Sequence, residues 1–237
     1  RALEHIRGKY ILFVDSDDTL RKGAVQALLS KALETNADIV QGGFVNITGH
    51  GLVFGRTGYR EGSAAETGQT PYGMAWGKVI RSSIFAHLKF PEGYWFEDTI
   101  FAFCIAPFRP AHYLIPAYVY NYTRNPLGIT LRSRKKAKAV DTVWIMRYLM
   151  ADLVQKKEVH SAQVQQLLLQ HIALAWYRLS RLDETVQQAA FLVMQQMYAA
   201  YYAPQDICVQ DSRLLALHQA LAAKNYGQYL AAAENLT

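Results

Sequence analysis

Apolar and polar positions along the start of the chain predict a strand, a helix and a second strand. Residues 10–14 form a short aromatic and β-branched run between Gly8 and a group of aspartates, which is typical of a buried strand. Residues 38–46 repeat the strand pattern. Between them, residues 21–35 carry apolar side chains at helical spacing, which predicts a helix with one buried face. That face is expected to consist of Val25, Leu28, Leu29, Ala32 and Leu33.

The middle of the chain predicts shorter elements. Residues 49–73 are rich in Gly, Ser and Thr, which favours a mobile loop with residues 52–54 as a hairpin arm. A short strand is expected at residues 76–81, and an apolar helix is expected to begin at residues 97–99. Two further strand patterns, separated by Pro116, are expected to end the α/β part near residue 131, at residues 112–115 and 118–123.

Beyond residue 135 the pattern changes to long helical periodicities rich in Ala, Leu and Gln. Breaks fall near Ser161, Asp183, Pro204 and Asn225. The sequence therefore predicts an α/β catalytic domain over residues 1–134 and an all-helical region over residues 135–237. Because the chain opens on Arg and residues 2–7 read as the end of a helix, we expect it to be a fragment.

The composition is that of a globular protein. The chain has 237 residues, of which 51% are hydrophobic, and its longest mainly apolar run, residues 100–108, is far below the roughly 20 residues of a membrane-spanning helix. Cys104 and Cys208 show no metal-binding spacing, which favours a reducing, cytoplasmic setting. The net charge of +6 is too modest to indicate nucleic-acid binding. The densest basic stretch, residues 132–138, suits phosphates or anionic lipid head groups, or is a solvated helix start.

Candidate chemistry begins after the first predicted strand, where residues 15–18 read Asp-Ser-Asp-Asp and are called the acidic turn below. Open α/β sheets bind ligands at the carboxyl ends of their strands. Asp15 and Asp17 offer the hard oxygen ligands that Mg²⁺ and Mn²⁺ prefer, especially when substrate phosphates complete the shell. Such a metal stabilises the negative charge of a departing diphosphate. The alternative is a turn that only caps the next helix.

A second pair of acids, Glu97 and Asp98, stands before the predicted apolar helix and is called the acid pair below. Transfer to a hydroxyl needs a general base as well as a leaving-group stabiliser, so both residues are candidate catalytic groups. The alternative is an N-cap with acids in a favourable first helical turn.

Four segments, in order over about 130 residues, resemble family-2 glycosyltransferases. Residues 8–18, GKYILFVDSDD, resemble the strand and DxD turn of that family. Residues 76–81, WGKVIR, resemble the stretch before its acceptor site, and residues 90–93 followed by the acid pair are similar to its ED motif. Residues 120–124 followed by Ile129 and Thr130 resemble its closing strand and loop.

The resemblance implies a partial GT-A fold, which is a Rossmann-like mixed α/β sheet, followed by a C-terminal all-helical region. It also implies an inverting transfer. Asp17 would be a direct metal ligand, and Asp15 would lie near the nucleotide's ribose or a metal-bound water. Asp98 would deprotonate the acceptor hydroxyl.

Other site residues are implied by the same segments, each with an ordinary structural alternative. Lys78, Arg124 and Thr130 are expected to contact phosphate or acceptor, and the alternative is a surface position. Trp76 is expected to stack on an acceptor sugar, and the alternative is a place in the core.

The implied partners are a nucleotide-sugar donor, expected to be a UDP-sugar, and a saccharide or lipid-linked acceptor, as in the synthesis of surface polysaccharides. The cytoplasm is the expected location. Peripheral contact with the inner face of the plasma membrane and homodimerisation through the helical region are left open. Two departures are visible: the family's opening strand with its acidic nucleotide-recognition turn is absent from this sequence, and Gly128 stands where Ser is expected. The activity of this fragment alone is therefore in question.

Two other functions fit part of the sequence. Residues 15–20, DSDDTL, also match the strand-end pattern of haloacid-dehalogenase-type phosphatases, in which Asp15 would be the nucleophile. The later Gly-Asp and second acid of that superfamily are not found. A non-catalytic module for assembly or carbohydrate binding is the other alternative.

Overall fold

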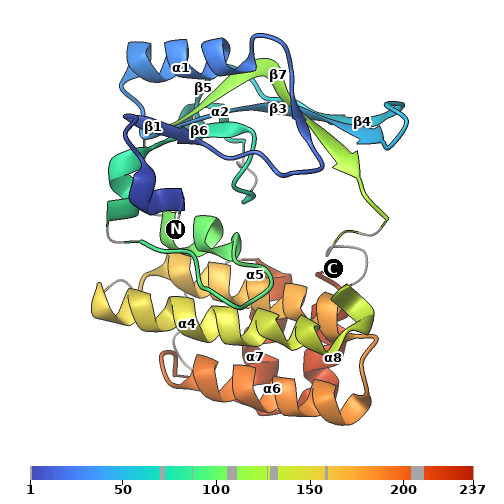
Figure 1. Cartoon of the computed structure of the whole chain (residues 1–237). Coiled ribbons are helices and arrows are strands. Elements are labelled where there is room, and N and C mark those ends of the chain that lie inside the picture. The colour runs from blue at the N-terminus through green and yellow to red at the C-terminus, as the bar shows by residue number, and fades with distance from the viewer. Residues whose placement is uncertain are drawn as a thin grey trace. The chain divides into compact units, whose positions relative to one another are not determined.

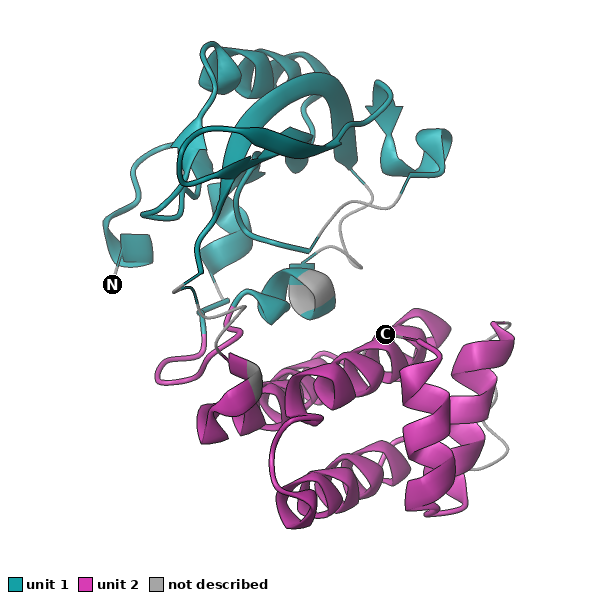
Figure 2. Cartoon of the chain, turned by 90° about the vertical axis from the view of Figure 1, so that its right-hand side faces the viewer, with its two compact units in different colours: residues 1–90, 98–128 teal, residues 91–97, 129–237 magenta. Residues whose placement is uncertain are grey.

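The chain forms two compact units, shown in Figure 2. The computed structural model describes residues 2–69, 73–86, 88–105, 111–126, 128, 133–157, 160–203 and 211–236. The α/β unit contains residues 1–90 and 98–128, and the helical unit contains residues 91–97 and 129–237. The predicted domain boundary at residue 134 stays a prediction. The short segment 91–97 groups with the helical unit although it lies far upstream in sequence.

A mixed sheet forms the centre of the α/β unit (Figure 1). Its main path runs β1-β6-β3-β7-β2, with β4 also pairing with β3 and β5 with β7. The pair of β3 and β7 is parallel, and the other described pairs are antiparallel. The predicted α/β class with a mixed sheet is confirmed. The strands span Tyr10–Leu12 (β1), Thr19–Leu20 (β2), Ile39–Thr48 (β3), Val53–Thr57 (β4), Gly62–Ser63 (β5), Lys78–Arg81 (β6) and His112–Arg124 (β7).

Helix α1 (Ala24–Thr35) packs on one face of this sheet. Its buried side chains are Ala24, Leu28 and Ala32, which repeat every four residues and form one narrow stripe. The predicted buried face was too wide, because Val25 and Leu33 are exposed. Small alanines bring the helix backbone close to the sheet, and the apolar residues beside the stripe then face water.

The segment predicted as a loop, residues 49–73, holds more structure than its composition suggested. The hairpin arm is confirmed as β4, which pairs with β3. The short strand β5 and the helix α2 (Ala64–Thr67) follow it. Ser63 and Glu66 form a capping box at the start of α2, which explains why so short a helix forms here. The loop prediction was therefore wrong for these residues.

Strand β7 continues through Pro116, where two separate strands were predicted. The pairing of β3 with β7 shifts register between Gln41 and Gly43, so the proline lies where the ladder is interrupted. A proline has no N–H to donate, and an irregular point in the ladder tolerates that loss. The sheet is crowded at the same place: a side chain at Gly42 would come within 2.6 Å of Val119 Cγ1.

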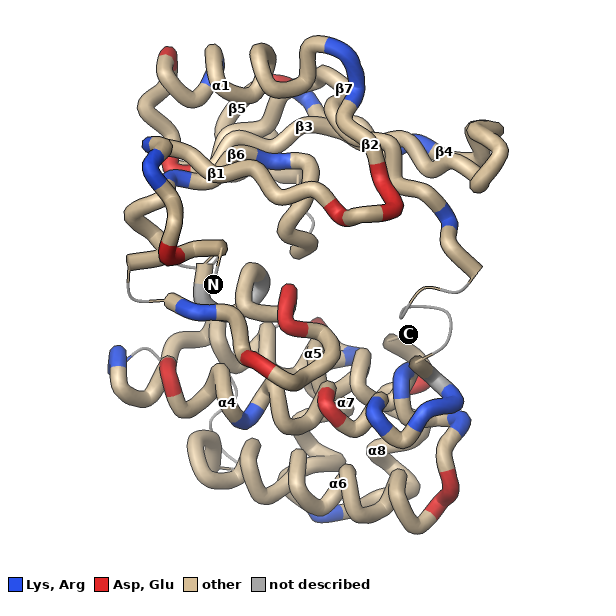
Figure 3. The backbone as a smooth tube through the Cα atoms, in the orientation of Figure 1, with Lys and Arg blue, Asp and Glu red and all other residues tan. Residues whose placement is uncertain are grey.

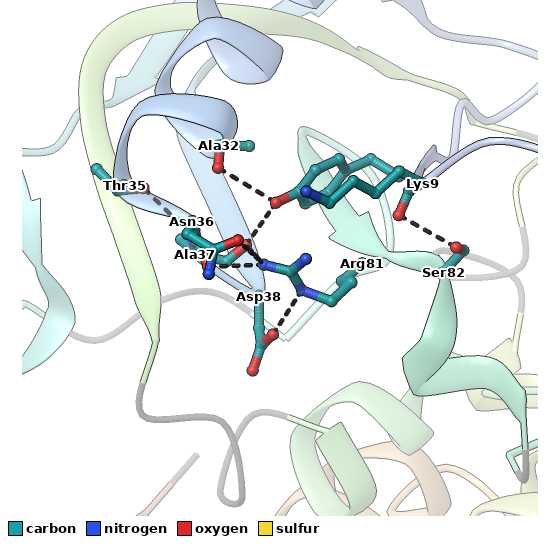
Figure 4. Close-up of polar contacts among 9 residues, drawn as sticks. Lys9, Ala32, Thr35, Asn36, Ala37, Asp38, Arg81 and Ser82 are labelled. Atoms are coloured by element: carbon teal, nitrogen blue, oxygen red, sulfur yellow. Dashed lines mark hydrogen bonds and ion pairs between the residues drawn. The ribbon is translucent and has the colours of Figure 1, made fainter.

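Arg81, at the end of β6, fixes the connection between α1 and β3 (Figure 4). Its Nε atom lies 2.8 Å from Asp38 Oδ1, and its Nη2 atom donates to the carbonyl oxygens of Asn36 and Ala37. The Tyr10 hydroxyl donates to the carbonyl oxygens of Ala32 and Ala37. The last residue of the WGKVIR segment therefore has a structural role, because it ties β1 and β6 to the end of α1.

Five α-helices make up most of the described part of the helical unit. Polar caps explain where several of them begin: Ser161 accepts from the N–H of Val164, Asp183 from that of Thr185, and Asn225 from that of Gln228. Three of the predicted breaks thus lie at N-caps, whereas Pro204 lies outside the described residues. No helix in the described ranges is long and apolar enough to cross a membrane. The five helices span Asp141–Gln155 (α4), Ala162–Leu179 (α5), Glu184–Ala199 (α6), Ser212–Ala222 (α7) and Tyr226–Glu234 (α8).

Segment 91–97 is held to the other residues of the helical unit by polar and aromatic contacts. The Trp95 N–H donates to Asp141 Oδ2 over 2.7 Å, and Lys138 Nζ donates to the Gly93 carbonyl over 2.7 Å. The Arg178 guanidinium lies 3.7 Å from the centre of the Phe96 ring. Phe96 has a φ of 66°, a left-handed conformation that costs a bulky residue free energy, so these contacts stabilise a strained backbone.

Candidate functional site

The acidic turn is held at the end of β1 by three residues near the C-terminal end of β7. The Asp15 N–H donates to the Tyr120 hydroxyl over 3.0 Å. The Thr123 N–H donates to Asp18 Oδ1 over 2.6 Å, and Asn125 Nδ2 donates to Asp17 Oδ2 over 2.8 Å. β2, directly after the turn, pairs with β7. These contacts join residues more than 100 positions apart and fix the turn on the sheet.

The three aspartates of the turn face different surroundings. Asp15 and Asp17 are exposed, and the acidic segment between β1 and β2 is visible in Figure 3. Asp18 is buried, and its Oδ2 atom has no hydrogen-bond partner. Burial raises the pKa of the Asp18 carboxyl, whereas the Thr123 N–H lowers it. Asp18 therefore anchors the turn to β7 through the Thr123 N–H, whereas the Asp15 and Asp17 side chains are exposed to solvent.

The donor set of the turn fits a metal that is shared with a substrate. Among the described residues, no group of three or more His, Cys, Asp or Glu side chains is placed to hold a metal ion. Asp15 and Asp17 supply carboxylate oxygens and no soft ligand. Mg²⁺ is commonly bound through one or two carboxylates, with substrate phosphates and water as the remaining ligands. The residues present match that arrangement.

Asp98, the candidate base, is partly buried in the α/β unit near a buried lysine. Lys78 on β6 is 2% exposed, so the surface alternative is wrong for this residue. Burial lowers the pKa of Lys78 to about 7, whereas the charge of Asp98 raises it. Lys78 Nζ also lies 6.0 Å from the centre of the Phe101 ring. Glu97 is exposed and groups with segment 91–97 of the helical unit.

The other predicted site residues lie in different places. Trp76 is 4% exposed and stacks on Tyr120 at 4.5 Å between ring centres. It is therefore a core residue, which was the alternative to a sugar-stacking role. Arg124 is exposed, with its guanidinium 6.0 Å from the Phe54 ring centre. Thr130 lies outside the described residues. Ligand contacts by all of these residues, and by Lys78, stay predictions.

Sequence reasoning missed the residues that support the acidic turn. The sequence placed these residues, Tyr120, Thr123 and Asn125, in or next to the closing strand and gave them no role. Their position in a family-like segment could have indicated one, because a loop that carries carboxylates needs polar partners. Gln41 and His112, which share a sheet face with Lys78, also went unnoticed because their neighbours are mostly apolar.

Comparison with known proteins agrees with this geometry. The model of the family described as "Glycosyl transferase family 2" matches residues 1–89, which include the acidic turn and Lys78. The match covers the first 89 of the chain's 237 residues, so it shows similarity to that family over this part. The family match stops short of the acid pair, so the catalytic role of Asp98 is not part of it. No curated protein matches the chain.

Solved structures show the same fold over nearly the whole chain. Residues 1–349 of S. aureus TarS in complex with UDP-GlcNAc superpose with a TM-score of 0.75 at 16% identity, covering 99% of this chain and 69% of that one. The complex of TarS with UDP gives a TM-score of 0.70 at 16% identity, covering 99% and 68%. A longer TarS chain gives 0.64 at 17% identity, with 99% of this chain and 41% of that one covered. The predicted GT-A fold is thereby confirmed.

Proposed function

We propose that this family-2 chain transfers a sugar from a nucleotide-sugar donor to an acceptor hydroxyl with inversion at the anomeric carbon. The observation that carries the proposal is the acidic turn. Its backbone is fixed by β7, and its Asp15 and Asp17 carboxylates are left exposed at the end of a strand. Carboxylates at fixed positions would hold a divalent cation without reorganising during the reaction, and the charge of that cation would stabilise a negatively charged leaving group.

The reaction is a single displacement. The acceptor oxygen forms a bond to the anomeric carbon while the bond from that carbon to the diphosphate oxygen breaks. Asp98 takes the proton of the acceptor hydroxyl, and the nucleoside diphosphate leaves with the electron pair. Bringing donor and acceptor together at one face also removes the entropic cost of a bimolecular encounter.

Asp15 and Asp17 would hold Mg²⁺ or Mn²⁺ against the donor's diphosphate. When bound, such an ion neutralises the charge that develops on the leaving diphosphate. Asp17 is oriented for this by Asn125, whose amide occupies one side of its carboxylate. Asp15 is oriented through its backbone by Tyr120.

The donor we propose is a UDP-sugar, because the TarS structures of this fold contain UDP-GlcNAc and UDP. The acceptor is a saccharide or a lipid-linked saccharide, in the synthesis of surface polysaccharides. Lys135 and Lys136 are exposed in the basic stretch and would favour anionic head groups, which supports a cytoplasmic protein that touches the inner membrane face. A homodimer through the helical unit remains part of the same proposal.

The test is sugar transfer by the full-length enzyme that contains this chain, with UDP-sugars and Mn²⁺. Asp17→Ala and Asp98→Ala should each lower turnover by about a hundredfold or more, since groups in these roles contribute that much. Glu4→Ala, which changes an exposed acid away from the turn, is the matched control. Turnover within about threefold of wild type in either variant would rule out that residue's role.

The two alternatives are less well supported. A haloacid-dehalogenase-type phosphatase would use Asp15 as a nucleophile, but the family match over residues 1–89 is to a glycosyltransferase. A non-catalytic module predicts no metal-dependent binding of UDP-sugars. Titration with and without Mn²⁺ separates that module from the transferase, and phosphatase activity would appear as phosphate release without sugar transfer.

A further inference from the structure

The sheet face opposite α1 carries a buried polar group in the middle of an apolar layer. Register places Lys78 opposite Gln41, and Ile39 opposite both Ile80 and His112. Because residues directly opposite or two apart share a face, Gln41, Lys78 and His112 all project to the same side. All three side chains are almost fully buried, with exposed fractions of 0%, 2% and 5%.

Two of these side chains, Gln41 and His112, each have a buried atom without a hydrogen-bond partner. Gln41 Nε2 donates to the Tyr59 hydroxyl over 3.0 Å, but Gln41 Oε1 has no hydrogen-bond partner. His112 Nε2 is also buried without a partner. A buried ammonium is costly unless a negative charge compensates it. A fold selected only for stability would place apolar side chains at such positions, as it does at the neighbouring Ile39 and Ile80.

We propose that Lys78 is a positioning residue for the transfer reaction, and that its buried ammonium holds the Asp98 carboxylate ionised and in place. The inference rests on the proposed function, in which Asp98 takes the acceptor proton. The Lys78 side chain is buried on the sheet face opposite α1, where an ionic interaction is stronger than at the surface.

The interaction between Lys78 and Asp98 acts in both directions. Lys78 Nζ lies 6.0 Å from the centre of the Phe101 ring, and the Phe101 N–H donates to the Asp98 carbonyl over 2.9 Å, so the lysine lies beside the helical turn that begins at Asp98. In line with this placement, the charge of Asp98 raises the pKa of Lys78 against the larger effect of burial. By the same coupling, a protonated Lys78 favours the ionised form of the carboxylate, which is the form that accepts a proton. The rigid strand β6 carries the lysine, and its register with β3 fixes where the side chain starts.

Two titratable neighbours, His112 and Tyr59, leave this pairing undisturbed. Burial lowers the pKa of His112 to about 3, and the charge of Lys78 lowers it further, so the imidazole is neutral at physiological pH. A neutral His112 neither repels Lys78 nor competes with it for Asp98. Tyr59 contacts the group through Gln41 and is uncharged in its hydroxyl form.

The experiment compares Lys78→Met, Lys78→Arg and the control Lys89→Met, which removes an exposed lysine of the same unit, in the full-length enzyme. Lys78→Met should lower kcat at least tenfold, leave both KM values within about twofold, and move the acid side of the pH–rate profile to higher pH. Lys78→Arg, which keeps the charge, should recover part of kcat. The protein should still fold, because Asp98 is only partly buried and water can solvate its carboxylate when the ammonium is lost.

Several results would overturn the inference. An unchanged pH profile would do so, as would a change confined to the acceptor KM, which would make Lys78 an acceptor-binding residue. A Lys78→Met protein that fails to fold would assign the lysine a purely structural role.

A second measurement does not depend on activity. Lys78→Met and Asp98→Asn, alone and combined in this chain, form a double-mutant cycle on the unfolding equilibrium. The inference predicts that the unfolding equilibrium constant of the double variant differs at least threefold from the value expected if the effects of the two single changes simply multiplied. If the wild type transfers no sugar but the cycle shows coupling, only the proposed function fails. If it transfers sugar and the cycle shows none, only the role of Lys78 fails.

Discussion

The two units bury polar side chains differently. In the helical unit, Gln165 Nε2 donates to the Tyr198 hydroxyl over 2.9 Å, and that hydroxyl lies 2.7 Å from His218 Nδ1. In the α/β unit, three buried side-chain atoms among the described residues are left without partners. Within the described ranges, the buried side-chain atoms that lack a hydrogen bond are Asp18 Oδ2, Gln41 Oε1 and His112 Nε2, all of them in the α/β unit.

This difference indicates what each unit is built to do. A buried polar atom without a partner costs about 1–3 kcal/mol, whereas a fully paired one is close to neutral or favourable. The helical unit uses its buried polar groups to fix one packing arrangement. The α/β unit tolerates unpaired groups beside the residues we assign to catalysis, which is where stability is commonly lost in exchange for activity.

The largest expected effect is the loss of α/β-unit stability in acid through His112. Its pKa is about 3 in the folded chain against an ordinary 6.5. Between these pH values the His112 imidazole is protonated in the unfolded chain and neutral in the folded chain. The contribution of His112 to stability is therefore fully present above pH 6.5 and falls as the pH drops toward 3, by about 1.4 kcal/mol per pH unit. Denaturation of His112→Phe at several pH values should show a flatter slope.

Lys78 adds to this dependence at higher pH. Its pKa of about 7 lies below the ordinary 10.5, so the unfolded chain holds the extra proton between these values and stability rises across that window.

The control for His112→Phe is His50→Gln, at an exposed histidine, which should leave the slope of stability against pH as it is in the wild type. Equal slopes for the wild type and His112→Phe would mean that His112 is not kept neutral by the fold.

A smaller effect is expected when the paired network of the helical unit is cut. Tyr198→Phe removes the hydroxyl that joins Gln165 and His218, and should lower the unfolding free energy by about 1–3 kcal/mol. Tyr148→Phe on α4, at an exposed tyrosine, is the matched control. If both variants lose the same stability, the network contributes nothing, and the contrast between the units disappears.

The smallest effect is expected at Asp18. Asp18→Asn keeps an oxygen for the Thr123 N–H and removes a buried charge, so stability should stay within about 1 kcal/mol of wild type or rise slightly. Asp18→Ala loses that acceptor and should cost more. Chemical denaturation gives the unfolding free energy of both variants. If Asp18→Asn is destabilised as much as Asp18→Ala, the charge itself is needed.

The sequence predicted elements well where the signal is local. The N-caps Ser161, Asp183 and Asn225 interrupt an apolar periodicity, and helices begin directly after them. The exposure of Val25 and Leu33 could not be predicted, because spacing gives the direction of a helix face and not its width. The continuity of β7 through Pro116 depends on a register shift in a neighbouring strand, which no local pattern contains.

The candidate site was predictable in position and not in its supports. A strand followed by the acidic turn was visible in the sequence, as was the acid pair. The hydrogen bonds that hold the turn come from Tyr120, Thr123 and Asn125, whose distance along the chain hides the contact. The burial of Lys78 was hidden for another reason: a lysine between Gly77 and Val79 reads as an ordinary exposed strand position.

Segment 91–97 limits how this protein can be divided or recombined. Its tryptophan, its glycine and its strained phenylalanine depend on Asp141, Lys138 and Arg178, which lie downstream of residue 128. A truncation after residue 128 would remove these partners and leave the backbone just before Asp98 without its anchors. Grafting the helices from a related enzyme would do the same unless the seven-residue segment were exchanged with them. The helical unit consists of two separate segments of the chain, so a single cut cannot separate it from the α/β unit.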